Sequence, residues 1–332
     1  MRKGFFCAAA MFALVLVSCE KGRHDVEECV RETVSMELKL AAEGTKASGE
    51  GGNEEKAVSN YQVFVFDMTN KMLEVYDTPD PSLSKVSIQC TTGPKEVVVL
   101  ANAPDLNGIV SYDAFLKTKS KLADNAVDKL VMEGRSSTNL TASGGTVTVE
   151  VRRIVSKVIL SGVTVDFEFN EYDKMDFVIR KVYLTNVAAD KTYLSEKADP
   201  TLWYNKNVSA SVTGVDPLIY EELGNINIKE TKKYTTKHHF YCYPNPYTTD
   251  TFLTDTWTER PTRLVLETVL GNVLYYYPIS LPELKQNTSY YVSLHIIRPG
   301  ATSPEQDMDK YAASFNVTIE EWKGPINVSD TI

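Results

Sequence analysis

The stretch Val34-Ser35-Met36-Glu37-Leu38-Lys39-Leu40 alternates apolar and polar side chains with a period of two. Successive side chains of a β-strand point to opposite faces, so this pattern predicts a strand with one buried face, formed by Val34, Met36, Leu38 and Leu40. The residues that follow, 43–60, begin with a run rich in Gly and Ser and carry several charges. Their composition predicts a loop after the first strand.

The same strand pattern recurs along most of the chain, separated by Gly, Pro and Asn turns. The sequence predicts strands at 61–66, 72–76, 86–90, 96–101, 146–151, 153–160, 163–169, 177–186, 240–243, 262–269, 273–278, 289–297 and 314–319. Apolar residues at helical spacing predict one or two short helices within 111–132. The polar stretch 188–236 shows little periodicity, so no element is predicted there. Many short strands indicate an all-β protein built from a pair of β-sandwiches.

The N-terminus has the features of an export signal. Arg2 and Lys3 precede the apolar run Phe5–Val17, and Leu16-Val17-Ser18-Cys19 follows the pattern of a bacterial lipobox. The run is shorter than the roughly 20 residues that a membrane-spanning helix needs. We therefore expect Cys19 to become the lipid-modified first residue, anchored by its acyl chains. A plain secretory signal with a chance Cys is the alternative.

The charge of the chain argues against nucleic acid as a partner, and its cysteines form no metal or redox motif. The chain has 332 residues, a net charge of −9 and 43% hydrophobic residues, which is typical of a globular protein and argues against binding to nucleic acid. Five Cys are present, and Cys29, Cys90 and Cys242 remain after the signal and the lipidated residue are set aside. Their spacing forms no metal or redox motif, so we expect mostly buried thiols, with one disulfide among the three left open.

No motif in the sequence predicts catalysis, a cofactor or a metal site. Gly49–Gly52 lacks the context of a phosphate-binding loop, and no nucleophile elbow is present. His238 and His239 are adjacent in a predicted strand and would point to opposite faces. Scattered acidic residues leave a hydrolase open, and the tyrosines at 275–277 and 290–291 leave a glycan-binding surface open. We expect a non-enzymatic protein that binds or assembles.

Several segments in order resemble the fimbrillin family of Bacteroidales, the subunits of type V pili. The matching pieces are Val63–Asp67, Val97–Asn102, Arg153–Val158, Phe240–Asn245 and Phe315–Ile319 with Trp322. The resemblance implies a lipoprotein precursor that folds as two transthyretin-like, Greek-key β-sandwich domains. A protease then cuts the loop after the first strand, and the C-terminal strand of a neighbouring subunit fills the groove that this strand leaves.

This resemblance divides the chain into a signal peptide at 1–18, a propeptide with the removable strand at 19–46, and sandwich domains at 47–160 and 161–332. The predicted donor strand occupies 314–332. Its apolar side chains are Phe315, Val317, Ile319, Trp322, Ile326 and Val328. Head-to-tail joining of unlike ends gives open filaments. From the residues alone, both terminal strands are equally compatible with ordinary strands of one domain.

The processing site departs from the family pattern, in which the best-known members are cut after Arg. Residues 41–60 contain no Arg, and Arg31 precedes the strand. We expect cleavage between Lys46 and Ala47, because small residues surround Lys46. The expected partners are a trypsin-like surface protease, the outer membrane before processing, and other copies or related fimbrial subunits. The expected location is the cell surface, first as a lipoprotein and then in a fimbrium. The alternative is an uncleaved lipoprotein that anchors a fimbria or binds glycans.

Overall fold

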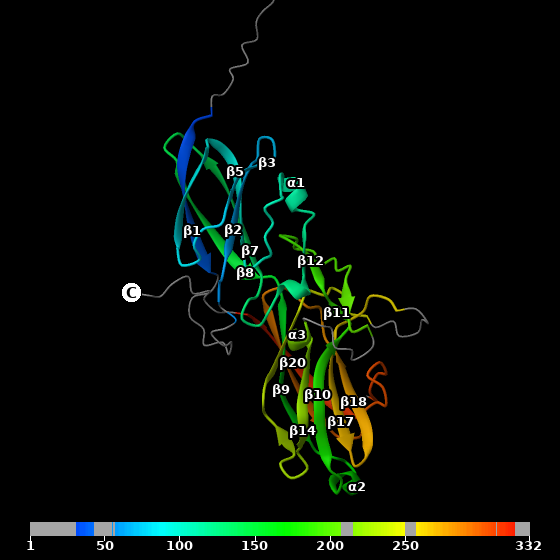
Figure 1. The fold of residues 1–332 in the computed structure, drawn as a ribbon. Helices are drawn as coiled ribbons and strands as arrows, with labels where there is room; N and C mark the ends of the chain where they lie inside the picture. The colour runs from blue at the N-terminus through cyan, green and yellow to red at the C-terminus, as the bar shows by residue number, and fades with distance from the viewer. Residues whose placement is uncertain are drawn as a thin grey trace, which may run out of the picture. The chain divides into compact units, whose positions relative to one another are not determined.

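The computed structural model describes residues 31–42, 55, 57–206, 215–249, 257–309 and 311–322 (Figure 1). Short strands dominate these residues, and the helices are single turns, which confirms the all-β class. None of the helices described here has the length and apolar character needed to span a membrane.

The N-terminal half forms one seven-stranded sheet in the order β3-β2-β5-β7-β8-β1-β4. Its strands are β1 (Thr33–Ala42), β2 (Tyr61–Asp67), β3 (Met72–Asp77), β4 (Lys85–Thr91), β5 (Gly93–Ala101), β7 (Met132–Leu140) and β8 (Gly145–Arg153). The short elements between β5 and β7 are α1 (Tyr112–Phe115), β6 (Lys119–Lys121) and the 3-10 turn η2 (Leu122–Asp124).

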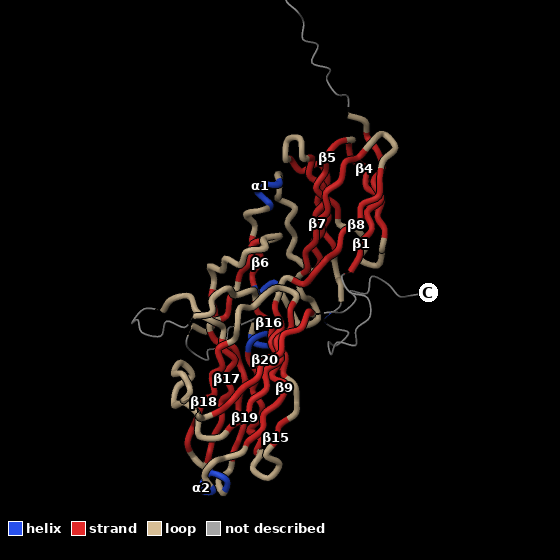
Figure 2. The backbone as a smooth tube through the Cα atoms, turned by 180° about the vertical axis from the view of Figure 1, so that it is seen from behind, coloured by secondary structure: helices blue, strands red, loops and turns tan. Residues whose placement is uncertain are grey.

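This sheet folds back on itself where β7 meets β8. The two strands pair at Met132–Arg153 and Glu133–Arg152, at the start of β7 and the end of β8. Apolar residues of β2, β5 and β7 then pack against those of β1, β4 and β8 in one buried cluster. The result is a sandwich whose layers are β3-β2-β5-β7 and β8-β1-β4. Figure 2 labels β5 and β7 of the first layer and all three strands of the second.

The C-terminal half contributes two larger sheets, in the orders β14-β10-β17-β18 and β15-β9-β19-β20, with β16 also paired to β9, and a two-stranded sheet of β11 and β13. The strands are β9 (Ser156–Val165), β10 (Phe177–Thr185), β11 (Val187–Ala188), β12 (Asp190–Thr192), β13 (Trp203–Tyr204), β14 (Tyr220–Asn227), β15 (Lys233–Tyr234), β16 (His238–Cys242), β17 (Arg263–Leu270), β18 (Val273–Ser280), β19 (Thr288–Ile296) and β20 (Ala313–Glu321). The helices are α2 (Asn170–Asp173) and α3 (Asp216–Ile219). A second apolar cluster fills the space between these sheets and extends to α1.

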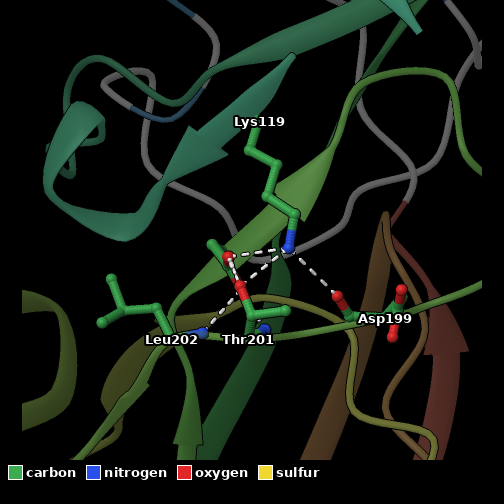
Figure 3. Close-up of polar contacts among 5 residues, drawn as sticks. Lys119, Asp199, Thr201 and Leu202 are labelled. Carbon is green, nitrogen blue, oxygen red and sulfur yellow. Dashed lines mark hydrogen bonds and ion pairs between the residues drawn. The ribbon is translucent and has the colours of Figure 1, made fainter. Parts of the chain in front are cut away.

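A small ladder joins the two halves, since β6 pairs with β12. Lys119 at its edge donates to Asp190 and to Thr201, each at 2.9 Å, and approaches the carbonyl of Asp199 (Figure 3). The Asp190 carboxylate also accepts the backbone N–H groups of Thr201 and Leu202, at 2.7 and 3.0 Å. Burial alone would raise the pKa of Asp190, but these hydrogen bonds outweigh it and lower the pKa.

The helices predicted within 111–132 are confirmed only in part. Ser111 caps α1 by accepting the Ala114 N–H at 3.2 Å, whereas residues 122–132 hold only η2, and Met132 already begins β7. The side chain of Asn125 explains the difference, because its Oδ1 accepts the Val131 N–H at 2.8 Å. When a side chain accepts a backbone N–H in this way, it takes the place of the backbone hydrogen bond that a helix would make.

Several strands differ from the predicted pattern. The predicted strands 153–160 and 163–169 form one element, since β8 ends at Arg153 and β9 then runs through residue 160 to Val165. All the ladder partners of β9 belong to the C-terminal half. The strands that the sequence missed are β6, β7, β11, β12, β13, β14 and β15. In β14 most side chains are exposed, so it has no alternation to detect.

Candidate functional site: the first and last strands

The first strand, β1, lies between two other strands of the N-terminal sandwich. It pairs in antiparallel fashion with β4, from Thr33–Thr91 to Lys39–Lys85. On its other side it pairs in parallel with β8, from Met36–Gly145 to Ala42–Val151. Both edges of β1 are therefore occupied by backbone hydrogen bonds.

The predicted apolar face of β1 is buried. Val34 and Leu40 are each 7% exposed, and Met36 and Leu38 are fully buried. The alternate residues between them lie toward solvent. The four apolar side chains reach the core shared with β2, β5 and β7. These side chains thus form part of the core between the two layers of the sandwich.

The strand β4 is attached to its sheet only through β1 among the described residues. Without β1, the inward side chains of β4 and β8 would face a groove open along its length. These side chains are Val86, Ile88, Cys90, Val147, Val149 and Val151. Such a groove would present unpaired backbone edges and apolar pockets at every second position, which is what an added strand recognises.

The turn between β7 and β8 touches the backbone of β1. Gly144 has φ +75°, and a Cβ added there would lie 2.3 Å from the carbonyl oxygen of Ser35. A side chain does not fit between the turn and the strand, so the glycine allows β1 to approach closely.

The last described strand, β20, is an edge strand. It pairs with β19 from Thr288–Glu321 to Ile296–Ala313, and no described strand pairs with its other edge. Phe315, Val317 and Ile319 lie opposite Leu294, Val292 and Tyr290 of β19, which are buried. Because opposite residues of an antiparallel pair share a face, the apolar side chains of β20 point to the inner face of the sheet.

That inner face of β20 is nevertheless uncovered. Phe315 is 48% exposed and Ile319 is 54% exposed, whereas Val317 is partly buried. Directly after the strand, Trp322 turns inward and is 6% exposed.

Other predicted site residues lie outside the described residues. These are Cys19, the cleavage pair Lys46 and Ala47, the donor residues Ile326 and Val328, and also Cys29. Their roles stay predictions.

The cysteines and histidines considered from the sequence are held in the folded structure by their neighbours. Cys90 and Cys242 are buried free thiols, and burial raises the pKa of Cys242 to about 12. His238 contacts Tyr234 and Glu221 at 2.6 and 2.7 Å, whereas His239 faces Glu55 on a different side. In the part of the chain that is described, no group of His, Cys, Asp or Glu could hold a metal ion.

The tyrosine clusters are divided between core and surface. Tyr277 and Tyr290 are buried, and the hydroxyl of Tyr290 accepts the Lys285 N–H at 2.8 Å. Tyr275, Tyr276 and Tyr291 are partly exposed. The adjacent tyrosines therefore do not form one continuous aromatic platform.

Sequence reasoning missed a buried charged group around Glu55. Burial alone would raise the pKa of this carboxyl, but hydrogen bonds from His239, Lys157 and Tyr241, together with the charge of Lys157, lower it to about 2. Burial lowers the pKa values of Lys157 and Arg153. Glu55 sits in a charged stretch of sequence, so no local signal distinguishes it from a solvated acidic residue.

Comparison with known proteins finds a match to one family over part of the chain. Residues 33–192 match the family model described as "Major fimbrial subunit protein (FimA)", which confirms the predicted resemblance to the fimbrillins. No curated protein matches the sequence significantly.

Solved structures share the fold. A proposed cell adhesion protein from Bacteroides eggerthii is 19% identical with a TM-score of 0.68, covering 88% of this chain and 96% of the other. A second proposed cell adhesion protein, from Parabacteroides distasonis, is 17% identical with a TM-score of 0.62, covering 88% and 100%. A fimbrilin (FimA) from Porphyromonas gingivalis is 16% identical with a TM-score of 0.60, covering 86% and 96%.

Proposed function

We propose that this relative of the fimbrillins is a structural subunit of a cell-surface fimbria, exported as a lipoprotein precursor and polymerised by donor-strand exchange. The family match and the adhesion proteins among the similar structures support the fimbrial role. The observation that carries the exchange mechanism is the contrast between a buried, doubly paired β1 and an exposed, singly paired β20.

The exchange begins with cleavage in the loop after β1, at Lys46 in our proposal. Cleavage severs β1 from the chain while leaving its hydrogen bonds to β4 and β8 intact. Departure of β1 then opens the groove described above. The incoming strand replaces both ladders and restores the apolar contacts, so little buried surface is lost overall.

The donor is the C-terminal segment that begins with β20. Phe315, Val317 and Ile319 repeat the spacing of Met36, Leu38 and Leu40. Phe315 and Ile319 are already about half exposed on an edge strand, so leaving β19 costs less buried apolar area than it would for a covered strand. Trp322, Ile326 and Val328 would continue the contact.

An assembly assay with two matched variants tests the donor role. Val317→Asp would bury an unpaired charge in the groove, so filaments of the protease-treated protein should be absent while secretion continues. Thr318→Asp places the same charge on the opposite, exposed face of β20 and should still assemble. Electron microscopy scores both, and normal filaments from Val317→Asp would contradict the proposal.

Intact mass spectrometry of the protein from its native surface tests the processing step. A lipid-free chain that starts at or near Ala47 would support removal of β1. A full-length chain with a diacyl or triacyl Cys19 would contradict it and favour the uncleaved anchor or glycan-binding lipoprotein.

A further inference from the structure

A buried ionic cluster holds Glu55, which lies on the segment between β1 and β2. Glu55 is 4% exposed, and Lys157 of β9 contacts both of its carboxylate oxygens, at 2.7 and 2.9 Å. The Tyr241 hydroxyl of β16 donates to the same carboxylate, and His239 lies 3.7 Å from it. Arg153 at the end of β8 donates to the backbone carbonyl of Glu55 at 3.1 Å. Both the side chain and the main chain of Glu55 are therefore fixed.

The same cations hold Trp322, directly after β20. The Arg153 guanidinium lies 4.6 Å from the centre of the indole ring, and the Lys157 ammonium lies 5.1 Å from it. The Tyr241 ring stacks on the indole at 5.8 Å. The backbone N–H of Trp322 donates to the Asn287 carbonyl at 2.9 Å. Trp322 is thus seated on residues that also contact Glu55.

The two contacts share Arg153 and Lys157, so an electrostatic change at one contact should reach the other. Arg153 and Lys157 are buried side by side, and the carboxylate of Glu55 supplies the negative charge that offsets them. If that charge is removed, the repulsion between these two cations loses the carboxylate that offsets it, and water or side-chain movement would respond. Either response disturbs the cation–π contacts, which depend on the position of each cation over the ring.

We propose that Glu55 is a positioning residue that keeps Trp322 seated, so that one pair of cations holds both the segment after β1 and the start of the C-terminal tail. This inference rests on the proposed function for its biological meaning. Cleavage before Glu55 would leave it on a segment no longer tethered to β1. Withdrawal of Glu55 would then release Trp322 and ease the departure of β20, which couples processing to donor release.

Hydrogen exchange on the unprocessed chain tests this coupling, with Glu55→Gln compared to Glu37→Gln. Glu37 is a partly exposed residue of β1, so its variant controls for loss of one acidic charge. In Glu55→Gln, a peptide covering β20 and Trp322 should exchange about tenfold faster, while a β5 peptide keeps its protection. Unchanged protection at Trp322 would overturn the proposal.

The reverse variant keeps the test valid if Glu55→Gln fails to fold. Trp322→Leu removes the ring but no charge, and by reciprocity it should speed exchange around Glu55. No effect there would overturn the coupling. Because these measurements need no filaments, the two proposals fail separately. A chain with the coupling that never assembles would contradict the proposed function, and one that assembles without the coupling would contradict only this inference.

Discussion

The strands β1 and β20 share a sequence pattern and differ in almost everything else. Both place apolar side chains at every second position. In β1 these side chains are buried and both edges are paired, whereas in β20 Phe315 and Ile319 are about half exposed and one edge is paired. The alternation therefore specifies which residues share a face, and the neighbouring strands decide whether that face is covered.

This difference predicts that changes in β1 affect mainly stability and that changes in β20 affect mainly the proposed assembly. The side chains of β1 complete a core in the unprocessed chain, so changes there should unfold it. Phe315 and Ile319 of β20 are about half exposed, so changes there should cost little stability and, under the proposed exchange, should affect mainly assembly. Variants in the two strands can test this separation directly.

The largest effect is expected for Leu38→Asp, which buries an unpaired carboxylate at the centre of β1. We expect a loss of more than about 4 kcal/mol in the free energy of unfolding. Chemical denaturation of the unprocessed chain measures it, with Ser35→Asp on the exposed face of β1 as the control. A loss under about 1 kcal/mol would mean that β1 is not part of the stable core.

The next largest effect is the dependence of stability on pH that Glu55 causes. Its carboxylate faces Lys157, His239 and Tyr241, and its backbone carbonyl accepts from Arg153. The folded-state pKa of Glu55, about 2, lies below its ordinary value of 4.5, so its stabilisation is present above about pH 4.5. It should be lost as the pH falls toward 2, by about 3 kcal/mol at most. Denaturation curves from pH 6 to 2 measure the loss, and Glu55→Gln should flatten this dependence. If the stability of Glu55→Gln falls as steeply with pH as that of the unchanged protein, other groups cause the dependence.

A smaller loss is expected for Gly144→Ala, which tests how tightly β1 is seated. The positive φ and the close Ser35 carbonyl together should cost about 1–3 kcal/mol. Gly108→Ala is the matched control, because no atom lies within 4 Å of its added Cβ. Thermal unfolding compares the two, and equal midpoints would show that the turn can move away from β1.

The smallest effect on the unprocessed chain is expected for Ile319→Ala in β20, within about 0.5 kcal/mol, because this side chain is 54% exposed. Leu38→Ala in β1 should instead cost about 2–5 kcal/mol. If Ile319→Ala costs as much as Leu38→Ala, β20 is a core strand and the comparison between the two strands fails. Filament yield of the same variants separates assembly from folding.

Most strands were predictable because their alternation is local. Two of the exceptions have a physical reason in the structure. The side chain of Asn125 hydrogen-bonds the backbone in a region with helical spacing, and β14 is too exposed to show alternation. The long-range ion pair of Glu55 with Lys157 joins residues on different elements, so no spacing in the sequence could reveal it.

The sequence by itself determined the all-β class, the alternating faces of the first and last strands, and the resemblance to the fimbrillins. These follow from side-chain periodicity and ordered segments, which need no knowledge of neighbours. Only the tertiary structure decided that β1 is central and buried, that β20 is an exposed edge, and that Glu55 and Trp322 share two cations. Burial and pairing depend on which distant strands come together, and the period of a single strand carries no information about its partners.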